Sequence, residues 1–397
     1  MNSKAKGEDE MNDWKEVQLN DVVSILGDGL HGTPKFNDSG EYYFINGNNL
    51  ADGKITIKPD TKRTTLEEYT KYKKNIDERT ILLSINGTLG NIAFYNGEKC
   101  ILGKSACYLN VLNTVDKDFI RYILTDEQFQ NYIDVFAHGS TIKNVSLKTI
   151  REYPFLLPPL PEQKAIAEVL SSLDEKIDLL HRQNKTLEAM AEALFRQWFV
   201  EEADEEWEEK PLSFFGKIVC GKTPSKNISQ YFGGNIPFIK IPDMHGKTFV
   251  FQTSDSLTNE GKTSQGNKTL PPKSICVSCI ATVGLTSLNA IESQTNQQIN
   301  SIIPDKPYFR YFLYLTMKTS YDLLQSLASG GTATSNLNTG DFSNIQIITP
   351  DESTLIDFNN YVEPLFDKIF HNQIQIRALE KLRDALLPKL MSGEVRV

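Results

Sequence analysis

Residues 160–200 read LPEQKAIAEVLSSLDEKIDLLHRQNKTLEAMAEALFRQWFV, and their apolar residues return at steps that alternate between four and three. This spacing is typical of a coiled-coil seam and differs from the wider apolar face of a globular helix. Because Pro161 and Glu162 suit a first helical turn, we predict one helix from Leu160 to about Val200, roughly 60 Å long. Its seam positions are Ile166, Leu170, Leu173, Ile177, Leu180, Asn184, Leu187, Ala191, Leu194 and Trp198.

A second segment with the same spacing lies near the C-terminus. Pro364 falls inside this segment and Pro388 near its end, and a proline removes a backbone donor from the helix. We therefore expect a kink or a late start in this helix. Its seam positions are Phe358, Val362, Leu365, Ile369, Asn372, Ile376, Leu379, Arg383, Leu386 and Leu390.

Each seam contains one asparagine, Asn184 in the first and Asn372 in the second. A buried amide opposite leucine or isoleucine would lack a hydrogen-bond partner, so the two asparagines are expected to face each other. If the helices pair antiparallel in that register, Trp198 faces Phe358. We predict this pairing.

The rest of the chain contains an internal sequence repeat, with its two copies about 192 residues apart. The segment 81–90 (ILLSINGTLG) matches 275–284 (ICVSCIATVG), and Trp14 recurs as Trp207. A period this long indicates a duplicated domain. Each copy begins with about 140 residues of short apolar runs broken by Gly, Pro, Asn and Asp, which is typical of a mixed α/β or β-rich globule. One long helix follows each globule.

Composition narrows the class of protein. The chain has 397 residues, five cysteines and a formal net charge of −9. No apolar run is long enough for a membrane span, and an odd number of cysteines favours the reducing cytoplasm over a disulfide framework. The acid is concentrated in residues 155–206, which carry −7, whereas residues 207–350 carry +3. Binding of nucleic acid by the globules therefore stays open.

Two motifs suggest chemistry that their surroundings do not support. Residues 216–223 (GKIVCGKT) match the phosphate-binding pattern G-x-x-x-x-G-K-[ST], but the polar, glycine-ended stretch after them does not predict the required helix. We expect a loop there. Cys276 and Cys279 form a lone C-x-x-C whose repeat partners are Leu82 and Ile85, so we expect buried strand positions and no metal site. No pattern of catalytic residues emerges, which favours a binding protein.

Candidate contacts with nucleic acid lie in polar, basic loops of both globules. Lys and Arg bind phosphates, while Gln, Asn and Arg read base edges. Ordinary solvated loops have the same composition, and that alternative stays open. The candidates are Lys58, Lys62, Arg63, Lys71, Lys73 and Lys74 in the first globule, and Lys222, Lys226, Lys262, Gln265, Asn267 and Lys268 in the second.

Two further candidates are the turns 139–144 and 330–336, which occupy the same place in the two copies. Small hydroxyl residues with free backbone N–H groups suit a phosphate, although an ordinary turn would look the same. The residues concerned are Ser140, Thr141, Lys143, Thr332, Ser335 and Asn336.

The chain resembles the specificity subunit of type I restriction–modification systems. The resemblance is carried by residues 157–177 (LPPLPEQKAIAEVLSSLDEKI) and 386–397 (LLPKLMSGEVRV), which look like the central and C-terminal constant regions of that family. Thr349-Pro-Asp-Glu-Ser departs from the usual start of the second helix, which puts the position of that start in doubt.

The resemblance implies an α+β chain in which two pseudo-symmetric α/β target-recognition domains are joined by two long antiparallel coiled-coil helices. Each domain would read one half of a bipartite, asymmetric site in double-stranded DNA. The helices would set the spacer and dock two methyltransferase subunits, which motor–endonuclease subunits join. The implied parts are a flexible tail (1–13), domain 1 (14–155), the central helix with an acidic linker (156–206), domain 2 (207–350) and the C-terminal helix (351–397).

The same resemblance implies that this chain is not an enzyme by itself and binds no cofactor or metal. S-adenosylmethionine, ATP and magnesium would belong to the partner subunits. The competing reading is a coiled-coil scaffold that displays two protein-binding globules and does not bind DNA.

Overall fold

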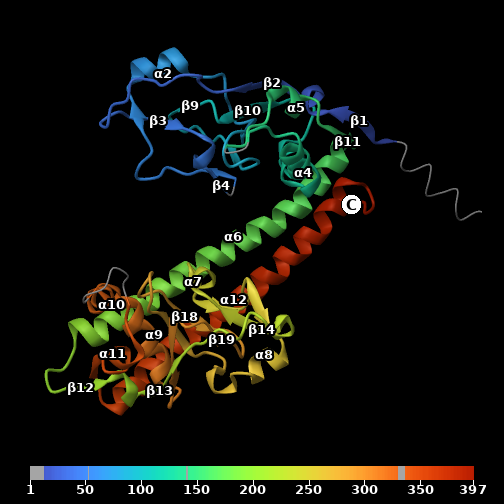
Figure 1. The fold of residues 1–397 in the computed structure, drawn as a ribbon. Coiled ribbons are helices and arrows are strands. Elements are labelled where there is room, and N and C mark those ends of the chain that lie inside the picture. The colour runs from blue at the N-terminus through green and yellow to red at the C-terminus, as the bar shows by residue number, and fades with distance from the viewer. Residues whose placement is uncertain (1–12, 52, 140–141, 330–335) are drawn as a thin grey trace, which may run out of the picture. The chain divides into compact units, whose positions relative to one another are not determined.

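The computed structural model describes residues 13–51, 53–139, 142–329 and 336–397. The predicted flexible tail, residues 1–13, lies outside the described residues except for Asp13. The chain divides into two compact units, Met1–Ile177 with Ala378–Val397, and Asp178–Arg377. Each unit therefore contains one globule together with a part of each long helix (Figure 1).

The first globule is built on a four-stranded antiparallel sheet in the order β2-β10-β7-β8. Side chains alternate between the two faces of a strand, and β7 uses both. Ile81 and Leu83 join the core under the helices, whereas Leu82 joins a second core with Ile45 and Leu102. The elements are β2 (Val23–Asp28), β7 (Thr80–Ser84), β8 (Ile92–Phe94), β10 (Ala106–Val111), α3 (Lys117–Thr125), α4 (Glu127–Val135) and α5 (Leu147–Arg151).

A smaller sheet in the order β6-β3-β9 covers that second core. Strand β3 pairs antiparallel with β6 and parallel with β9. Thr65 caps the short helix α2 by accepting from the backbone of Glu68. The remaining elements are β1 (Lys15–Gln18), β3 (Tyr42–Ile45), β4 (Leu50–Ala51), β5 (Lys54–Ile55), β6 (Arg63–Thr64), α2 (Leu66–Tyr72), β9 (Cys100–Leu102) and β11 (Pro154–Leu157).

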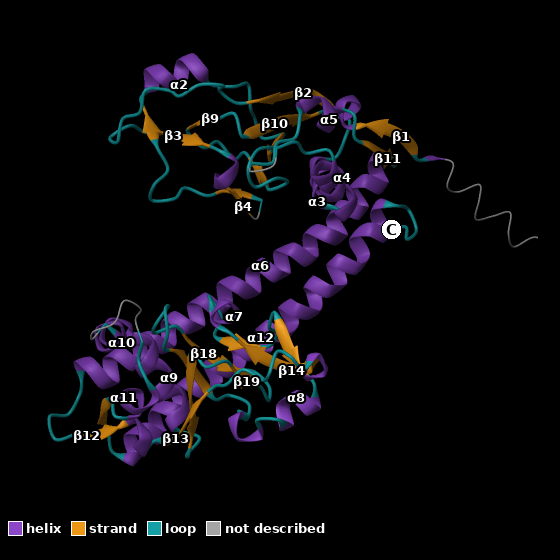
Figure 2. Ribbon diagram, viewed as in Figure 1, coloured by secondary structure: helices purple, strands orange, loops and turns teal. Residues whose placement is uncertain are grey.

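The second globule repeats this plan, as Figure 2 shows by element type. Its main sheet runs β13-β20-β17-β18-β15, and its small sheet has β14 antiparallel to β16 and parallel to β19. The predicted duplication is confirmed in this topology. The elements are β12 (Glu208–Pro211), β13 (Gly216–Cys220), β14 (Phe232–Ile239), α7 (Ile241–Met244), β15 (Phe249–Val250), β16 (Asp255–Leu257), α8 (Asn259–Thr263), β17 (Ile275–Ser278), β18 (Thr286–Asn289), β19 (Gln294–Thr295), β20 (Ile299–Pro304), α9 (Phe309–Thr319), α10 (Tyr321–Ala328), α11 (Thr339–Ser343) and β21 (Gln346–Thr349).

The long helices are α6 (Leu160–Arg196), extended by a π-helical turn at Gln197–Glu201, and α12 (Glu352–Met391). The predicted antiparallel register is confirmed. Asn372 Nδ2 donates to Asn184 Oδ1 at 2.9 Å, and the rings of Trp198 and Phe358 lie 5.8 Å apart between centroids. This arrangement also confirms the predicted α+β class with two similar globules.

The structure contradicts part of two local predictions. Helix α12 begins twelve residues before Pro364 and continues through it, so there is no late start. The neighbours Val362 and Phe366 are fully buried, and this packing holds a turn that proline alone would weaken. The expected kink stays a prediction. In the motif 216–223, where we expected a loop, Gly216–Cys220 form strand β13 because they complete a ladder with β20, whereas residues 221–223 form a loop that no helix directly follows.

Cys276 is confirmed at a buried position of strand β17, and burial raises the pKa of its thiol to about 12. Cys279, directly after that strand, is also buried, and burial raises the pKa of its thiol to about 11. Both side chains belong to hydrophobic cores of the second globule. In the part of the chain that the structure describes, no helix is long and apolar enough to cross a bilayer.

Carboxylates of α6 anchor each globule to the helix pair. In the first unit, Asp174 accepts from Tyr122 Oη at 2.7 Å and lies 3.3 Å from Arg121 Nη2, both on α3. Arg383 of α12 contacts the other oxygen of Asp174 at 3.0 Å. Glu162, near the start of α6, accepts from the Trp14 indole at 3.0 Å.

The second unit uses a lysine for the same purpose. Lys318 Nζ on α9 lies 2.8 Å from Glu192 and 3.4 Å from Glu188 on α6. Glu188 also accepts a hydrogen bond from Thr248. Burial opposes the charge of Lys318, but contacts with Tyr314 and Glu192 outweigh it and raise the lysine pKa. Part of the acid in residues 155–206 is therefore neutralised within the protein.

We predict that Asn184→Leu lowers the free energy of unfolding by about 2 kcal/mol, because the buried amide of Asn372 then keeps only a long contact of 3.5 Å with Gln183 Oε1. The double variant Asn184→Leu/Asn372→Leu should recover most of that loss, since two leucines fill the seam without an unpaired amide. Urea unfolding of the full chain measures both. Strictly additive losses in the double variant would contradict the assigned pairing.

A second prediction concerns the lysine anchor. Lys318→Met should lower the free energy of unfolding by about 1–2 kcal/mol, because it leaves Glu188 and Glu192 facing each other. Adding Glu192→Gln should restore part of the loss. Because the raised lysine pKa keeps Lys318 charged, the effect should be constant up to about pH 10 and should fall only above the unfolded pKa of 10.5. Lys368→Met, at an exposed lysine of α12, is the matched control.

Candidate nucleic-acid interface

The turn between β7 and β8 closes one end of the main sheet in the first globule. Gly90 N donates to Ser84 O at 2.9 Å, and the Gln130 side chain, on α4, donates to the Gly90 carbonyl at 3.2 Å. Gly87 and Gly90 have φ angles of +79° and +83°, in the left-handed region. The turn is thus fixed by its own backbone and by a neighbouring helix, and Thr88 is exposed at its tip.

The second globule repeats this turn between β17 and β18. Gly284 N donates to Ser278 O at 2.9 Å, and the Gln325 side chain, on α10, donates to a carbonyl of the turn at 2.7 Å. The left-handed positions recur at Ala281 (+65°) and Gly284 (+92°), although this conformation costs an alanine about 1 kcal/mol. Thr282 is exposed at the tip, as Thr88 is in the first globule.

The turns that we predicted as phosphate sites lie beside these two tips. Gly87 N donates to the Lys143 carbonyl at 2.9 Å, and the exposed Lys143 side chain forms an ion pair with Asp134. Asn336 is exposed and forms an isolated β-bridge with Ile280. The other members of this set, Ser140, Thr141, Thr332 and Ser335, lie outside the described residues.

One exposed lysine lies near the first turn. It is Lys104, next to Ser105, whose carbonyl accepts from Ile85 N at 3.0 Å. In the second globule the predicted candidate Lys222 is exposed, follows β13 and donates its backbone N–H to Thr295 O at 2.9 Å. Lys104 and the two tip threonines were not among our sequence-predicted residues. The repeat between 81–90 and 275–284 already marked the turns, but it did not show which side chains they expose.

Most of the other candidates of the first globule gather on its small sheet. The Arg63 guanidinium lies over the Tyr43 ring at 5.1 Å, and Lys71 Nζ lies 4.8 Å from the centroid of Tyr72. The rings of Tyr42 and Tyr69 stack at 4.3 Å. Exposed cations beside aromatic faces are typical of surfaces that bind nucleic acid. Four further candidates are also placed here: Lys58, Lys62 and Lys73 are exposed, and Lys74 is half-buried.

The corresponding surface of the second globule is more polar and less basic. Lys262 is paired with Glu292 at 2.8 Å. Gln265 is buried, and its amide donates to the Lys222 carbonyl and to Gln294, so it supports the loop from inside. The remaining candidates differ in exposure: Lys226 and Asn267 are exposed, and Lys268 is half-buried.

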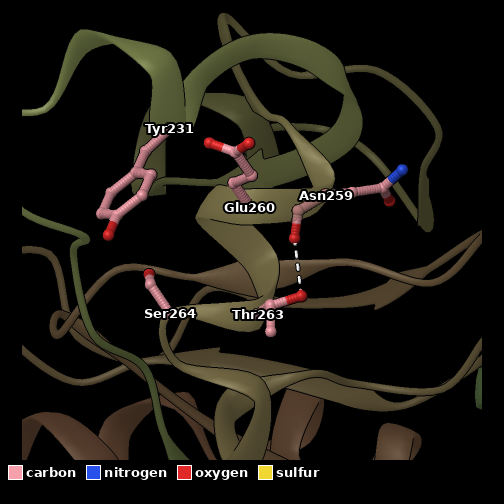
Figure 3. Close-up of a pocket in the computed structure, with 5 residues that line it drawn as sticks. All are labelled: Tyr231, Asn259, Glu260, Thr263 and Ser264. Atoms are coloured by element: carbon pink, nitrogen blue, oxygen red, sulfur yellow. Dashed lines mark hydrogen bonds between the residues drawn. The ribbon is translucent and has the colours of Figure 1, made fainter.

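A shallow hollow of about 530 Å³ lies on this surface. Figure 3 shows its lining, in which Thr263 Oγ1 donates to the Asn259 carbonyl at 2.7 Å. Tyr231 offers an aromatic face and Glu260 a carboxylate. Such groups fit polar contacts with bases better than contacts with phosphate. Elsewhere in the described ranges, no group of three or more His, Cys, Asp and Glu is arranged to hold a metal ion.

Comparisons with known proteins agree with this organisation. The family model of the type I restriction modification DNA specificity domain matches residues 11–189 and 204–356. The type I restriction enzyme HindI specificity subunit of Haemophilus influenzae is 33% identical over 467 residues, covering 97% of this chain and 100% of the relative. The MjaIX specificity subunit of Methanocaldococcus jannaschii is 27% identical, with 97% and 94% covered.

A solved structure shares the fold. The S subunit of a type I restriction–modification system from M. genitalium superposes with a TM-score of 0.63 at 18% identity, covering 95% of this chain and 96% of that one. Together with the family match, this confirms the resemblance carried by residues 157–177 and 386–397. The chain belongs to the family of type I restriction–modification specificity subunits.

Proposed function

We propose that this chain selects the DNA sequence for a type I restriction–modification complex, and that each globule reads one half of a bipartite, asymmetric site. The observation that carries the proposal is the pair of globules with similar sheets and different surfaces. Arg63 and the lysines around it give the first globule a cationic, aromatic surface, whereas Lys262 of the second is paired with a carboxylate. Two globules with similar sheets and different surfaces suit two half-sites that differ in sequence.

In this proposal the cations position the globules on the phosphates, and the polar groups between them read the bases. Arg63 is the strongest base-reading candidate of the first globule, because its guanidinium is exposed and is presented beside Tyr43. Arginine can donate two hydrogen bonds to one guanine. In the second globule, the hollow around Tyr231 supplies hydroxyl, amide and carboxylate groups for the same purpose.

The long helices would set the spacer and dock two methyltransferase subunits, which motor–endonuclease subunits would join. Exposed apolar side chains on both helices support a docking role, since solvent-facing helix positions are usually polar. Met190 of α6 and Leu382 of α12 are both about half exposed and stand 192 residues apart, close to the offset of the repeat. A repeated apolar position on each helix suits two copies of one partner.

Catalysis would then rest with the partners. S-adenosylmethionine, ATP and magnesium belong to the methyltransferase and motor subunits in this proposal, which acts in the cytoplasm. The competing scaffold that does not bind DNA is tested by salt. A DNA-binding chain loses affinity steeply as salt rises, because bound phosphates release counterions. A scaffold would retain no DNA at any salt concentration.

The decisive experiment is modified-base sequencing of the source genome with and without this gene. We expect one bipartite methyladenine motif to disappear on deletion and to return when the gene is restored. An unchanged methylome, together with failure to co-purify a methyltransferase, would contradict the proposal.

Exchange of the first globule tests the division of labour. Replacing residues 14–155 by the matching segment of another specificity subunit should change one half of the methylated motif and leave the other half intact. The reason is that each globule has its own cores and sheets. A swap that changed both halves of the motif would show that the globules do not read independently.

A further inference from the structure

The hydrogen bonds and φ angles of turn 85–90 and turn 279–284 are more alike than the surfaces around the two turns. Beyond the bonds already described, Asn91 N donates to Ser84 Oγ at 2.9 Å, and Leu285 N donates to Ser278 Oγ at the same distance. In each globule, a segment that comes later in the chain donates a backbone hydrogen bond to the first residue of the turn. Val145 N donates to Ile85 O at 3.0 Å.

In the second globule, the equivalent tie runs from Leu337 N to Cys279 O at 2.9 Å. The shape persists although the sequences differ, with Asn86-Gly-Thr-Leu in one turn and Ile280-Ala-Thr-Val in the other. Ala281 keeps its left-handed φ of +65° without the freedom of a glycine. Strain that survives a change of sequence points to a task of the turn itself.

The nature of that task follows from what two unequal half-sites share. Contacts with bases must differ between the half-sites of an asymmetric target, but the sugar–phosphate backbone is the same in both. Each tip carries an exposed threonine preceded by a residue with almost no side chain. The threonine hydroxyls are donors for a phosphate oxygen, and the tips carry no bulky apolar group that would fill a pocket of a protein partner.

The charges near the first turn agree with this reading. Lys104 is exposed near the first turn. The carboxylate of Asp134, close to this turn, is already paired with Lys143. A phosphate at the first tip would therefore meet a paired carboxylate and an exposed cation.

We propose that Thr88 and Thr282 are equivalent DNA-backbone contacts, one in each globule, and that they fix each globule on the duplex whatever sequence it reads. The proposal rests on DNA binding as the function of the chain. Gln130 and Gln325 are positioning residues, because each holds a carbonyl of its turn and neither is at the tip.

The test places charge substitutions at the two exposed tips of the full chain. It measures the affinity of each variant for two DNA duplexes, one that contains the motif identified by modified-base sequencing and one that lacks it. Thr88→Glu and Thr282→Glu should each weaken binding to both duplexes about tenfold, because a carboxylate repels the phosphate. Thr88→Lys and Thr282→Lys should strengthen both and steepen the salt dependence by about one charge. The preference for the motif should stay within about twofold of the wild-type value.

Thr114 provides the matched control. It is exposed, and it follows β10 at the end where Asn110 pairs with Thr80, opposite the end where Ala106 pairs with Ser84. Thr114→Glu and Thr114→Lys should leave both affinities unchanged. Equal effects at Thr114 and Thr88 would overturn the proposal by showing a general effect of charge.

The remaining outcomes separate the alternatives. Loss of binding only to the duplex with the motif would assign the tips to base reading and would overturn a backbone role. Unchanged DNA binding with loss of methyltransferase co-purification would assign them to protein docking. Wild-type protein that binds neither duplex would defeat the proposed function itself, and this inference with it.

Discussion

The hydrogen bond between Asn184 and Asn372 is the constraint on which the rest of the structure depends. In a seam of leucine and isoleucine, an amide is tolerated only where another polar group meets it. A slip of one heptad would bury both asparagines against aliphatic side chains. The bond therefore selects one antiparallel register. That register also places Asp174 of α6 within reach of Arg383 of α12, so one carboxylate joins both helices and the first globule.

The helix pair and the duplication could be predicted because both are visible as repeats in the sequence. The helices show a regular spacing of apolar residues, and the duplication shows as matching segments. The failures are local, and each has a tertiary cause. Pro364 suggested that the helix could start late, but the helix begins twelve residues earlier and the residues around Pro364 are buried. Gly216–Cys220 has the letters of a nucleotide-binding loop, but a ladder with β20 extends it into a strand. Pairing with a distant segment overrides a local pattern in both cases.

The interface was predicted less well, because exposure and charge pairing are set by residues far away in the sequence. The residues around Gln265 are typical of a surface loop. Gln265 is nevertheless buried, and its amide donates a hydrogen bond to the Lys222 carbonyl. Lys262 appears as a free cation in the sequence but meets Glu292, thirty residues later. Thr88 carried no chemical motif. Only the repetition of its turn, fixed by the same bonds in both globules, distinguishes it.

The acidic net charge does not conflict with binding to DNA, because part of the acid contacts other groups of the protein and the charge is unevenly distributed along the chain. Glu162 meets the Trp14 indole, and Glu188 and Glu192 share Lys318. These carboxylates attach the globules to helices and are partly neutralised there. The surfaces left over are unequal, with exposed lysines and Arg63 around stacked tyrosines on the first globule. A chain can therefore repel polyanions on average and still present them with local cationic surfaces, since screening limits each field to about 10 Å.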